Sequence, residues 1–173
     1  MTEIDDTCRC LCAQCAQEPA PYPVIGLWAP DAYFALGPRA RRAAELSDLW
    51  CVIDGPAGTT HHLCTWIDVP ITDRPGTALT YAPWVRVDGA DFDRVLEHWD
   101  DPLFRETFVG ELSGPIPTYP DEPTTVRLRT DGLTTARFLP GAGGALARDA
   151  DRGITHAEAE LRIRTILLCE DDV

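Results

Sequence analysis

Residues 50–71 of the chain read WCVIDGPAGTTHHLCTWIDVPI, and this stretch decides the fold. Residues 50–54 form a short run rich in β-forming residues, which predicts a strand, and residues 61–71 form a longer run that predicts a second strand. Between the two runs, Gly55-Pro56-Ala57-Gly58 is typical of a turn. The stretch therefore predicts a β-hairpin, and a sheet is the base from which the rest of the chain can be interpreted.

Further strands are predicted after this hairpin. Leu79, Tyr81, Val85 and Val87 alternate with other residues, which indicates a third strand that bends at Pro83. The alternation places these apolar side chains on one face, as expected for a strand with one side against a core.

Residues 124–139 predict a second hairpin that turns at residues 130–132. This turn pairs Val126 with Ala136 and keeps the apolar side chains on one face. The opposite face then carries a basic concentration on an acidic chain, which consists of Arg127, Arg129 and Arg137. Such a face can bind a carboxylate or a phosphate, although pairing with the protein's own acidic side chains is the more ordinary use.

Helical patterns flank the strands. Residues 31–46 predict a helix in two pieces interrupted at Gly37-Pro38, and Asp88 is expected to cap a helix with an apolar stripe. A capping box that begins at Thr155 predicts a last helix. Residues 110–123 and 140–153, rich in Gly with Pro or Ala, are expected to be loops. The predicted class is α+β, a mainly antiparallel sheet with about three flanking helices.

The chain is expected to divide at about residue 30. Residues 1–30 contain a Cys-rich knuckle followed by a Pro-rich arm, because Pro19, Pro21 and Pro23 prevent a regular helix. Residues 31–173 then form a single α+β domain, which suits a chain of 173 residues with 45% hydrophobic side chains.

The charge balance is strongly acidic. The formal net charge is −13, and all 15 basic residues are Arg. An acidic surface repels nucleic acid and anionic lipid, so neither a nucleic acid nor a membrane is an expected partner, whereas a basic protein or a cation is. No apolar run is long enough for a membrane helix and no secretory signal is evident, so a cytoplasmic location is expected.

Four of the seven Cys residues lie within eight consecutive residues, 8–15, near the N-terminus: Cys8, Cys10, Cys12 and Cys15. An odd Cys count without a secretory signal argues against a disulfide framework. Thiolates are soft ligands that favour Zn²⁺, and the Cys12-x-x-Cys15 spacing lets two sulfurs reach one tetrahedral ion. The cluster therefore predicts a zinc site.

Other uses of the thiols remain open at this level. Two of the ligands could come from His61, His62 or Cys64, although neighbouring side chains on a strand point to opposite faces. The N-terminal thiols could instead be reduced or adventitiously oxidised without any metal, or Cys12 and Cys15 could be a redox couple. The remaining Cys residues sit among apolar neighbours and are expected to be small buried hydrophobes: Cys51, Cys64 and Cys169.

Several stretches together resemble a bacterial family, the domain of unknown function two-one-nine-nine. The resemblance covers nearly the whole chain and is carried by Cys12-x-x-Cys15 and by LSDLWCVIDG (46–55), IDVPI (67–71), WVRV (84–87), HWDDP (98–102), FVGELS (108–113) and PTYP (117–120). Members have an N-terminal Cys-x-x-Cys that usually continues with Gly and a nearby His, and a His-Pro-Leu-Ala stretch near the end. Here Ala16 and the sequence GALA at residues 144–147 stand in those places.

The leading interpretation is a zinc-binding, non-catalytic accessory protein in which the metal holds the N-terminal arm to an α+β body. The alternative is an acidic interaction module, for example an immunity protein that neutralises a basic partner. The third is an enzyme that uses a Cys or a metal-bound water, for which the sequence offers no recognisable motif.

If the family histidines are ligands, Cys8 and Cys10 replace them in this chain. We expect the Cys8→Ser, Cys10→Ser variant to bind zinc with lower affinity or stoichiometry, because two of four soft ligands are lost. Zinc titration of the purified variant against the wild type measures this. Unchanged stoichiometry and affinity would remove Cys8 and Cys10 from the ligand set.

Overall fold

The computed structural model describes residues 21–130 and 136–170, with the side chains of residues 168–170 left out. In this part of the chain the helices are α1 (Asp31–Phe34), α2 (Pro38–Ala43), α3 (Gly89–Glu97), α4 (Ala145–Arg152) and α5 (His156–Glu170). The strands are β1 (Glu45–Leu46), β2 (Trp50–Gly55), β3 (Gly58–Pro70), β4 (Ala78–Tyr81), β5 (Trp84–Val87), β6 (Thr107–Leu112), β7 (Thr125–Thr130) and β8 (Ala136–Leu139). The α+β class is confirmed, with more helices than the sequence predicts.

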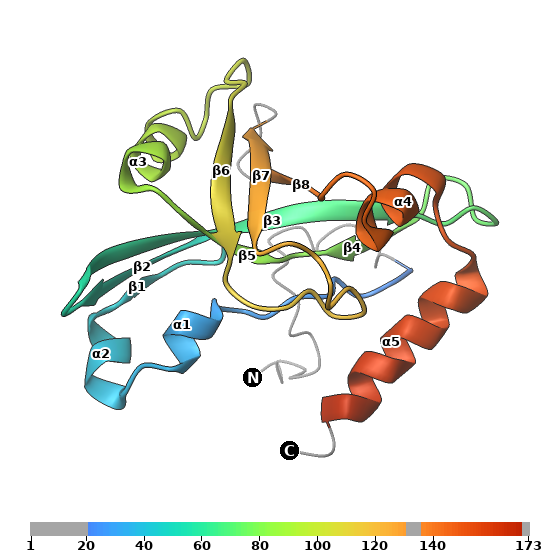
Figure 1. Cartoon of the computed structure of the whole chain (residues 1–173), viewed down its shortest axis with the longest axis horizontal. Coiled ribbons are helices and arrows are strands. Elements are labelled where there is room, and N and C mark those ends of the chain that lie inside the picture. Colours follow the sequence, from blue (N-terminus) through green and yellow to red (C-terminus); the bar gives the residue numbers. More distant parts are fainter. Residues whose placement is uncertain (1–20, 131–135, 171–173) are drawn as a thin grey trace, which may run out of the picture.

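The predicted first hairpin is confirmed as β2 and β3. Its register runs from Trp50 opposite Leu63 to Gly55 opposite Gly58, so Pro56 and Ala57 form the turn. Gly58 has a φ of +118°, a conformation that favours glycine. The hairpin is long enough to project from the body as a twisted ribbon edged by β1 (Figure 1).

β3 is the strand around which the sheet is organised, and it crosses the whole molecule (Figure 1). On one edge it pairs with β2 and then, where β2 stops, with β8. On the other edge it pairs with β5 and β4. The order β3-β5-β6-β7-β8 returns to β3, so these five strands form a closed barrel.

The predicted bend at Pro83 is also confirmed. β4 and β5 both run antiparallel to β3 in one continuous register, with Tyr81 opposite Ile67 and Trp84 opposite Cys64. At the break Pro83 has no N–H to donate, but its carbonyl oxygen accepts a hydrogen bond from the Thr65 N–H at 3.0 Å. The strand therefore bends without losing its place beside β3.

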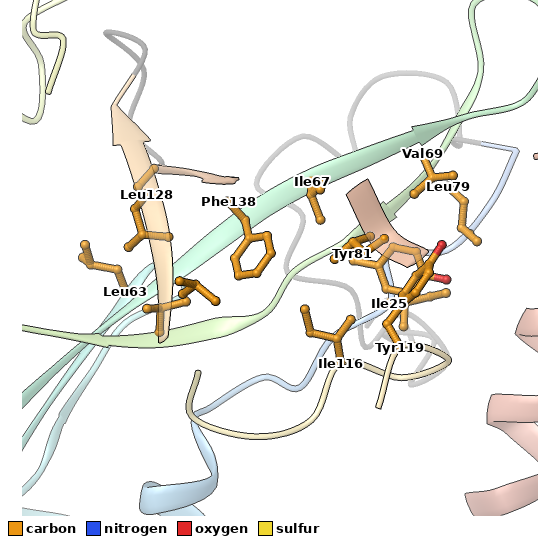
Figure 2. Packing of buried hydrophobic residues seen from close by; sticks show 14 of the residues in the cluster. Ile25, Leu63, Ile67, Val69, Leu79, Tyr81, Ile116, Tyr119, Leu128 and Phe138 are labelled. Carbon is orange, nitrogen blue, oxygen red and sulfur yellow. The ribbon is translucent and has the colours of Figure 1, made fainter. Parts of the chain in front are cut away.

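Two apolar cores lie on the two faces of β3. The larger core extends from the barrel, where Leu63, Leu128 and Phe138 are almost fully buried, to Leu79 and Tyr81 of β4 (Figure 2). The smaller core contains Cys51, Ile53, Cys64, Ala82 and Trp84. Side chains of α1 and of the segment around it cover the smaller core, whereas α3 lies on the opposite face of the sheet (Figure 1).

The predicted register of the second hairpin is wrong. The sequence predicts Val126 opposite Ala136, whereas the structure pairs Thr130 with Ala136 and Leu128 with Phe138. The strand pairing therefore ends at Thr130 and Ala136, because this register sets Phe138 opposite Leu128, and both side chains are almost fully buried in the core. The apolar and the arginine faces of the hairpin are nevertheless as predicted, because the two registers differ by an even number of residues.

Three other segments differ from expectation. Residues 45 and 46 form β1 rather than the end of a helix, and β6 extends to Leu112, so residues 110–112 of the predicted loop 110–123 belong to a strand. β6 carries Gly110, where an added Cβ would lie 2.5 Å from Val85 Cγ1, so a close approach to β5 explains a glycine within a strand. α4 lies within residues 140–153, which the sequence predicts to be a loop. Leu146 is the fully buried side chain of this helix.

The described part of the arm lies along the sheet. Ile25 forms a parallel bridge with Tyr81, its N–H donates to Thr80 O at 2.9 Å, and its carbonyl oxygen accepts from the Ala82 N–H at 2.8 Å. An added Cβ at Gly26 would lie 2.6 Å from the Ala82 carbonyl oxygen, so the approach requires glycine. The knuckle itself precedes residue 21 and lies outside the described residues.

Leu128 tests the barrel core. We expect Leu128→Ala to lower the free energy of unfolding by about 2–5 kcal/mol, because the cavity lies among side chains that cannot collapse freely. Urea denaturation measures the change. Leu103→Ala is the matched control, because Leu103 is 82% exposed, and we expect its effect to stay within about 0.5 kcal/mol. Equal effects of the two substitutions would contradict the core assignment.

Candidate functional site

The alternation of β3 separates the two adjacent histidines. Thr60, His62 and Cys64 share one face, and His61 points to the other, where its ring lies 4.8 Å from that of Phe92. The structure thus brings His62 and Cys64 to the same face and takes His61 away from them. His61 is partly buried, whereas His62 is buried, at 2% exposure.

His62 has a hydroxyl on each side of its ring. Nδ1 lies 2.8 Å from Ser113 Oγ and Nε2 lies 3.3 Å from Thr60 Oγ1. Burial lowers the pKa of His62 to about 4, and the positive charges of Arg86 and His61 add to this effect. At neutral pH the imidazole is therefore uncharged, and either tautomer is satisfied, because each hydroxyl can donate or accept.

A shallow pocket of about 220 Å³ opens beside His62. Neighbouring positions on three strands contribute His62, Arg86 and Glu111 in one row across the sheet. Arg86 and Glu111 form an ion pair at the rim, with both side chains about half exposed. The lining consists of Ala32, Thr60, His62, Arg86, Glu111, Leu112 and Ser113.

The pocket has only part of the chemistry of a catalytic site. Ser113 and His62 are within the distance of a nucleophile and its base, and Thr60 orients the imidazole. However, a histidine with a pKa near 4 is a weak base at neutral pH. Arg86 and Glu111 at the rim also pair with each other, so neither offers an uncompensated charge to a substrate. The arrangement fits a buried imidazole held by two hydroxyls better than an activated serine.

The two described thiols are buried and unreactive. Burial raises the pKa of Cys51 to about 11, and burial with the nearby Asp48 raises that of Cys64 to about 12. Both are therefore protonated thiols that pack as small hydrophobes, as the sequence predicts. Cys8, Cys10, Cys12 and Cys15 lie outside the described residues. Among the described side chains, those of residues 21–130 and 136–167, no group of three or more His, Cys, Asp or Glu residues is placed to hold a metal ion.

The arginine face of the second hairpin is exposed as predicted. Arg127, Arg129 and Arg137 alternate with buried residues, and Arg129 lies directly opposite Arg137. Arg137 Nη2 lies 3.6 Å from Asp68 Oδ2. This face thus uses at least one of the protein's own carboxylates, which is the ordinary interpretation of a basic patch on an acidic chain.

A polar cluster that sequence reasoning missed joins α4 and α5 to the loop after β6. Arg162 Nη2 and the Tyr119 hydroxyl both donate to Asp149 Oδ2 at 2.9 Å, and the Arg162 guanidinium lies 5.0 Å from the centre of the Tyr119 ring. Burial alone lowers the pKa of Arg162, but hydrogen bonds to Glu158 and Asp149 outweigh it and raise the pKa. The three residues are far apart in the sequence, so no local pattern could reveal them.

Fold and site together define a small α+β protein built on a five-stranded barrel, with a polar pocket between the barrel and α1. The chain belongs to the family of uncharacterized proteins conserved in bacteria designated DUF2199, whose sequence profile matches residues 11–154. The resemblance noted in the sequence is thereby confirmed. The matched stretch includes Cys12 and Cys15, begins after Cys8 and Cys10, and ends before α5.

Comparison with curated proteins and with solved structures found no match. No helix in the described part of the chain is both long enough and apolar enough to cross a membrane.

The buried imidazole predicts a pH dependence of stability. The pKa of His62 is about 4 in the folded protein and 6.5 for an unperturbed imidazole, so the unfolded chain binds more protons between these values. Stability that is present above pH 6.5 is therefore lost as the pH falls towards 4. We expect the wild type to lose more stability over this range than His62→Gln, by at most about 3 kcal/mol.

Urea unfolding at several pH values measures this difference. Acidic side chains titrate in both proteins and cancel in the comparison. His98→Gln makes the same chemical change at a partly exposed imidazole and serves as the control. Parallel stability curves for the wild type and His62→Gln would show that His62 does not titrate abnormally.

Proposed function

We propose that this protein is a metal-binding, non-catalytic accessory protein that holds zinc through Cys8, Cys10, Cys12 and Cys15. The observation that carries the proposal is the presence of four thiols within eight residues of sequence. Thiolate ligands favour Zn²⁺, and a Cys-x-x-Cys turn is a recurrent half of structural zinc sites. The match to the family profile includes the Cys12-x-x-Cys15 pair.

The other Cys and His residues that could bind a metal, in the described part of the chain, are less suited to it, and this supports the assignment. Cys51 and Cys64 have raised pKa values, and a metal would first have to remove their protons inside an apolar core. His62 already has a hydroxyl beside each ring nitrogen, and His61 lies on the other face of the strand. These residues are therefore weaker candidates for the metal than the N-terminal thiols.

The arm that follows the Cys cluster is anchored on the body of the protein, and this anchoring supports a structural role for the metal. Tyr22 is buried, and its hydroxyl lies 2.6 Å from His156 Nδ1 at the start of α5. Ile25 is held on the edge of the sheet by two backbone hydrogen bonds. A metal bound shortly before this point is joined to a fixed place on the body, so metal binding can add stability to the whole fold.

A second candidate function is an acidic interaction module. Its supporting observation is the net charge of −13, which speeds association with a basic protein and repels other polyanions. A cytoplasmic location and a basic protein partner belong to this proposal. Association that weakens steeply with added salt would support it.

Elemental analysis of protein purified without added metal tests the zinc proposal. We expect about one zinc ion per chain in the wild type, as in a four-thiolate site, and near-complete loss in Cys12→Ser, Cys15→Ser. The Cys51→Ala, Cys64→Ala variant is the matched control, because it removes two thiols without touching the cluster, and it should keep its zinc. Wild-type protein without metal that also fails to bind added zinc would overturn the proposal. Loss of zinc in the control variant would instead move the site to the body of the protein.

A further inference from the structure

An exposed aromatic surface lies where the arm enters α1. Leu27 and Trp28 are 49% and 50% exposed, whereas Ile25 and Ala29, which flank them, are buried. Trp28 continues into a cluster of rings, at 5.1 Å from Phe34 and 5.5 Å from Tyr33, each in an edge-on arrangement. A half-exposed Trp packed on further aromatic rings is a common feature of binding surfaces.

The backbone at this surface is fixed from below. Trp84 Nε1, in the smaller core, donates a hydrogen bond to the Leu27 carbonyl oxygen at 2.8 Å. Ala29 and Pro30 are buried directly after Trp28. The protein therefore presents the Trp28 side chain from a rigid position, so that a partner loses little binding energy to ordering it.

Arginines extend the aromatic cluster along α2. The Arg41 guanidinium lies 6.0 Å from the centre of the Tyr33 ring and donates a hydrogen bond to the Phe34 carbonyl oxygen. Arg39 and Arg42 are also exposed on this short helix. Residues 21–46 contain these three Arg residues against Asp31 and Glu45, in a chain whose net charge is −13. This local excess of positive charge is the reverse of the overall balance.

We propose that this aromatic–arginine surface, formed by Trp28, Tyr33, Phe34, Arg39, Arg41 and Arg42, docks a short acidic segment of a partner protein that also carries apolar side chains. The arginines pair with its carboxylates, and Trp28 with its neighbouring rings covers its apolar side chains. The proposal extends beyond zinc binding and does not depend on it.

Charge complementarity selects this occupant over the alternatives. A basic partner attracted by the net charge of −13 would meet like charge at Arg39 and Arg42. A nucleic acid is a long polyanion, and beyond three arginines it would run into the acidic remainder of the surface. A short acidic segment matches the size of the patch and avoids both penalties.

Selection from a library of random displayed peptides on the full-length protein tests the proposal. We expect enriched peptides to combine Asp or Glu with Leu, Phe or Trp. A selected peptide, labelled and measured by fluorescence anisotropy, should bind Trp28→Ala at least about tenfold more weakly than the wild type. The Arg39→Gln, Arg42→Gln variant should weaken binding and reduce its dependence on salt concentration.

The control variant is Leu103→Ala, Arg105→Gln, which removes an exposed apolar side chain and an exposed arginine between α3 and β6, on the other side of the sheet (Figure 1). It should bind the selected peptide like the wild type, and all variants should keep the wild-type unfolding midpoint. Enrichment of basic peptides or of no common composition would overturn the proposal. Equal affinity of the wild type and Trp28→Ala for the selected peptide would also overturn it. So would a single-stranded oligonucleotide that binds the wild type more tightly than the peptide does and that no longer binds Trp28→Ala or the Arg39→Gln, Arg42→Gln variant.

Discussion

Backbone hydrogen bonding along both edges of β3 is the constraint on which the structure depends. A meander with an odd number of strands ends with its last strand parallel to its first, so closing the barrel requires the parallel pairing of β3 with β8. The pairing of β3 with β2 extends along β3 as far as Leu63, and β8 pairs with the same edge of β3 from Thr65 onward. One strand thereby serves the hairpin ribbon and the barrel, and in its central part, residues 62–65, both of its faces are buried.

This double role explains the site as well as the core. Because both faces of β3 are covered, His62 has to be buried among polar groups that satisfy it, and hydroxyls of Thr60 and Ser113 meet this need. α1 lies against the same face, and an added Cβ at Gly114 would lie 2.4 Å from the Asp31 carboxylate. The pocket is thus a consequence of how α1 covers a polar position on a central strand.

The sequence predicted those elements whose signals are local. The turn at Gly55-Pro56-Ala57-Gly58, the bend at Pro83 and the cap at Asp88, whose side chain accepts from the Ala90 N–H, are all found. It failed where long-range packing decides, at the register of Phe138 and at α4. The partnership of His62 with Ser113 could not be predicted, because it joins residues of different strands whose pairing no single strand pattern reveals.

The parallel seam between β3 and β8 has a consequence for folding order. It consists of Thr65 opposite Ala136 and Trp66 opposite Arg137, so it joins parts of the chain that are distant in sequence. Such closure is slow, because the intervening chain must be ordered first. Until β8 arrives, this stretch of β3 carries unpaired backbone donors and acceptors beside apolar side chains. The nascent barrel is therefore most vulnerable to intermolecular pairing at the strand that later becomes its most protected element.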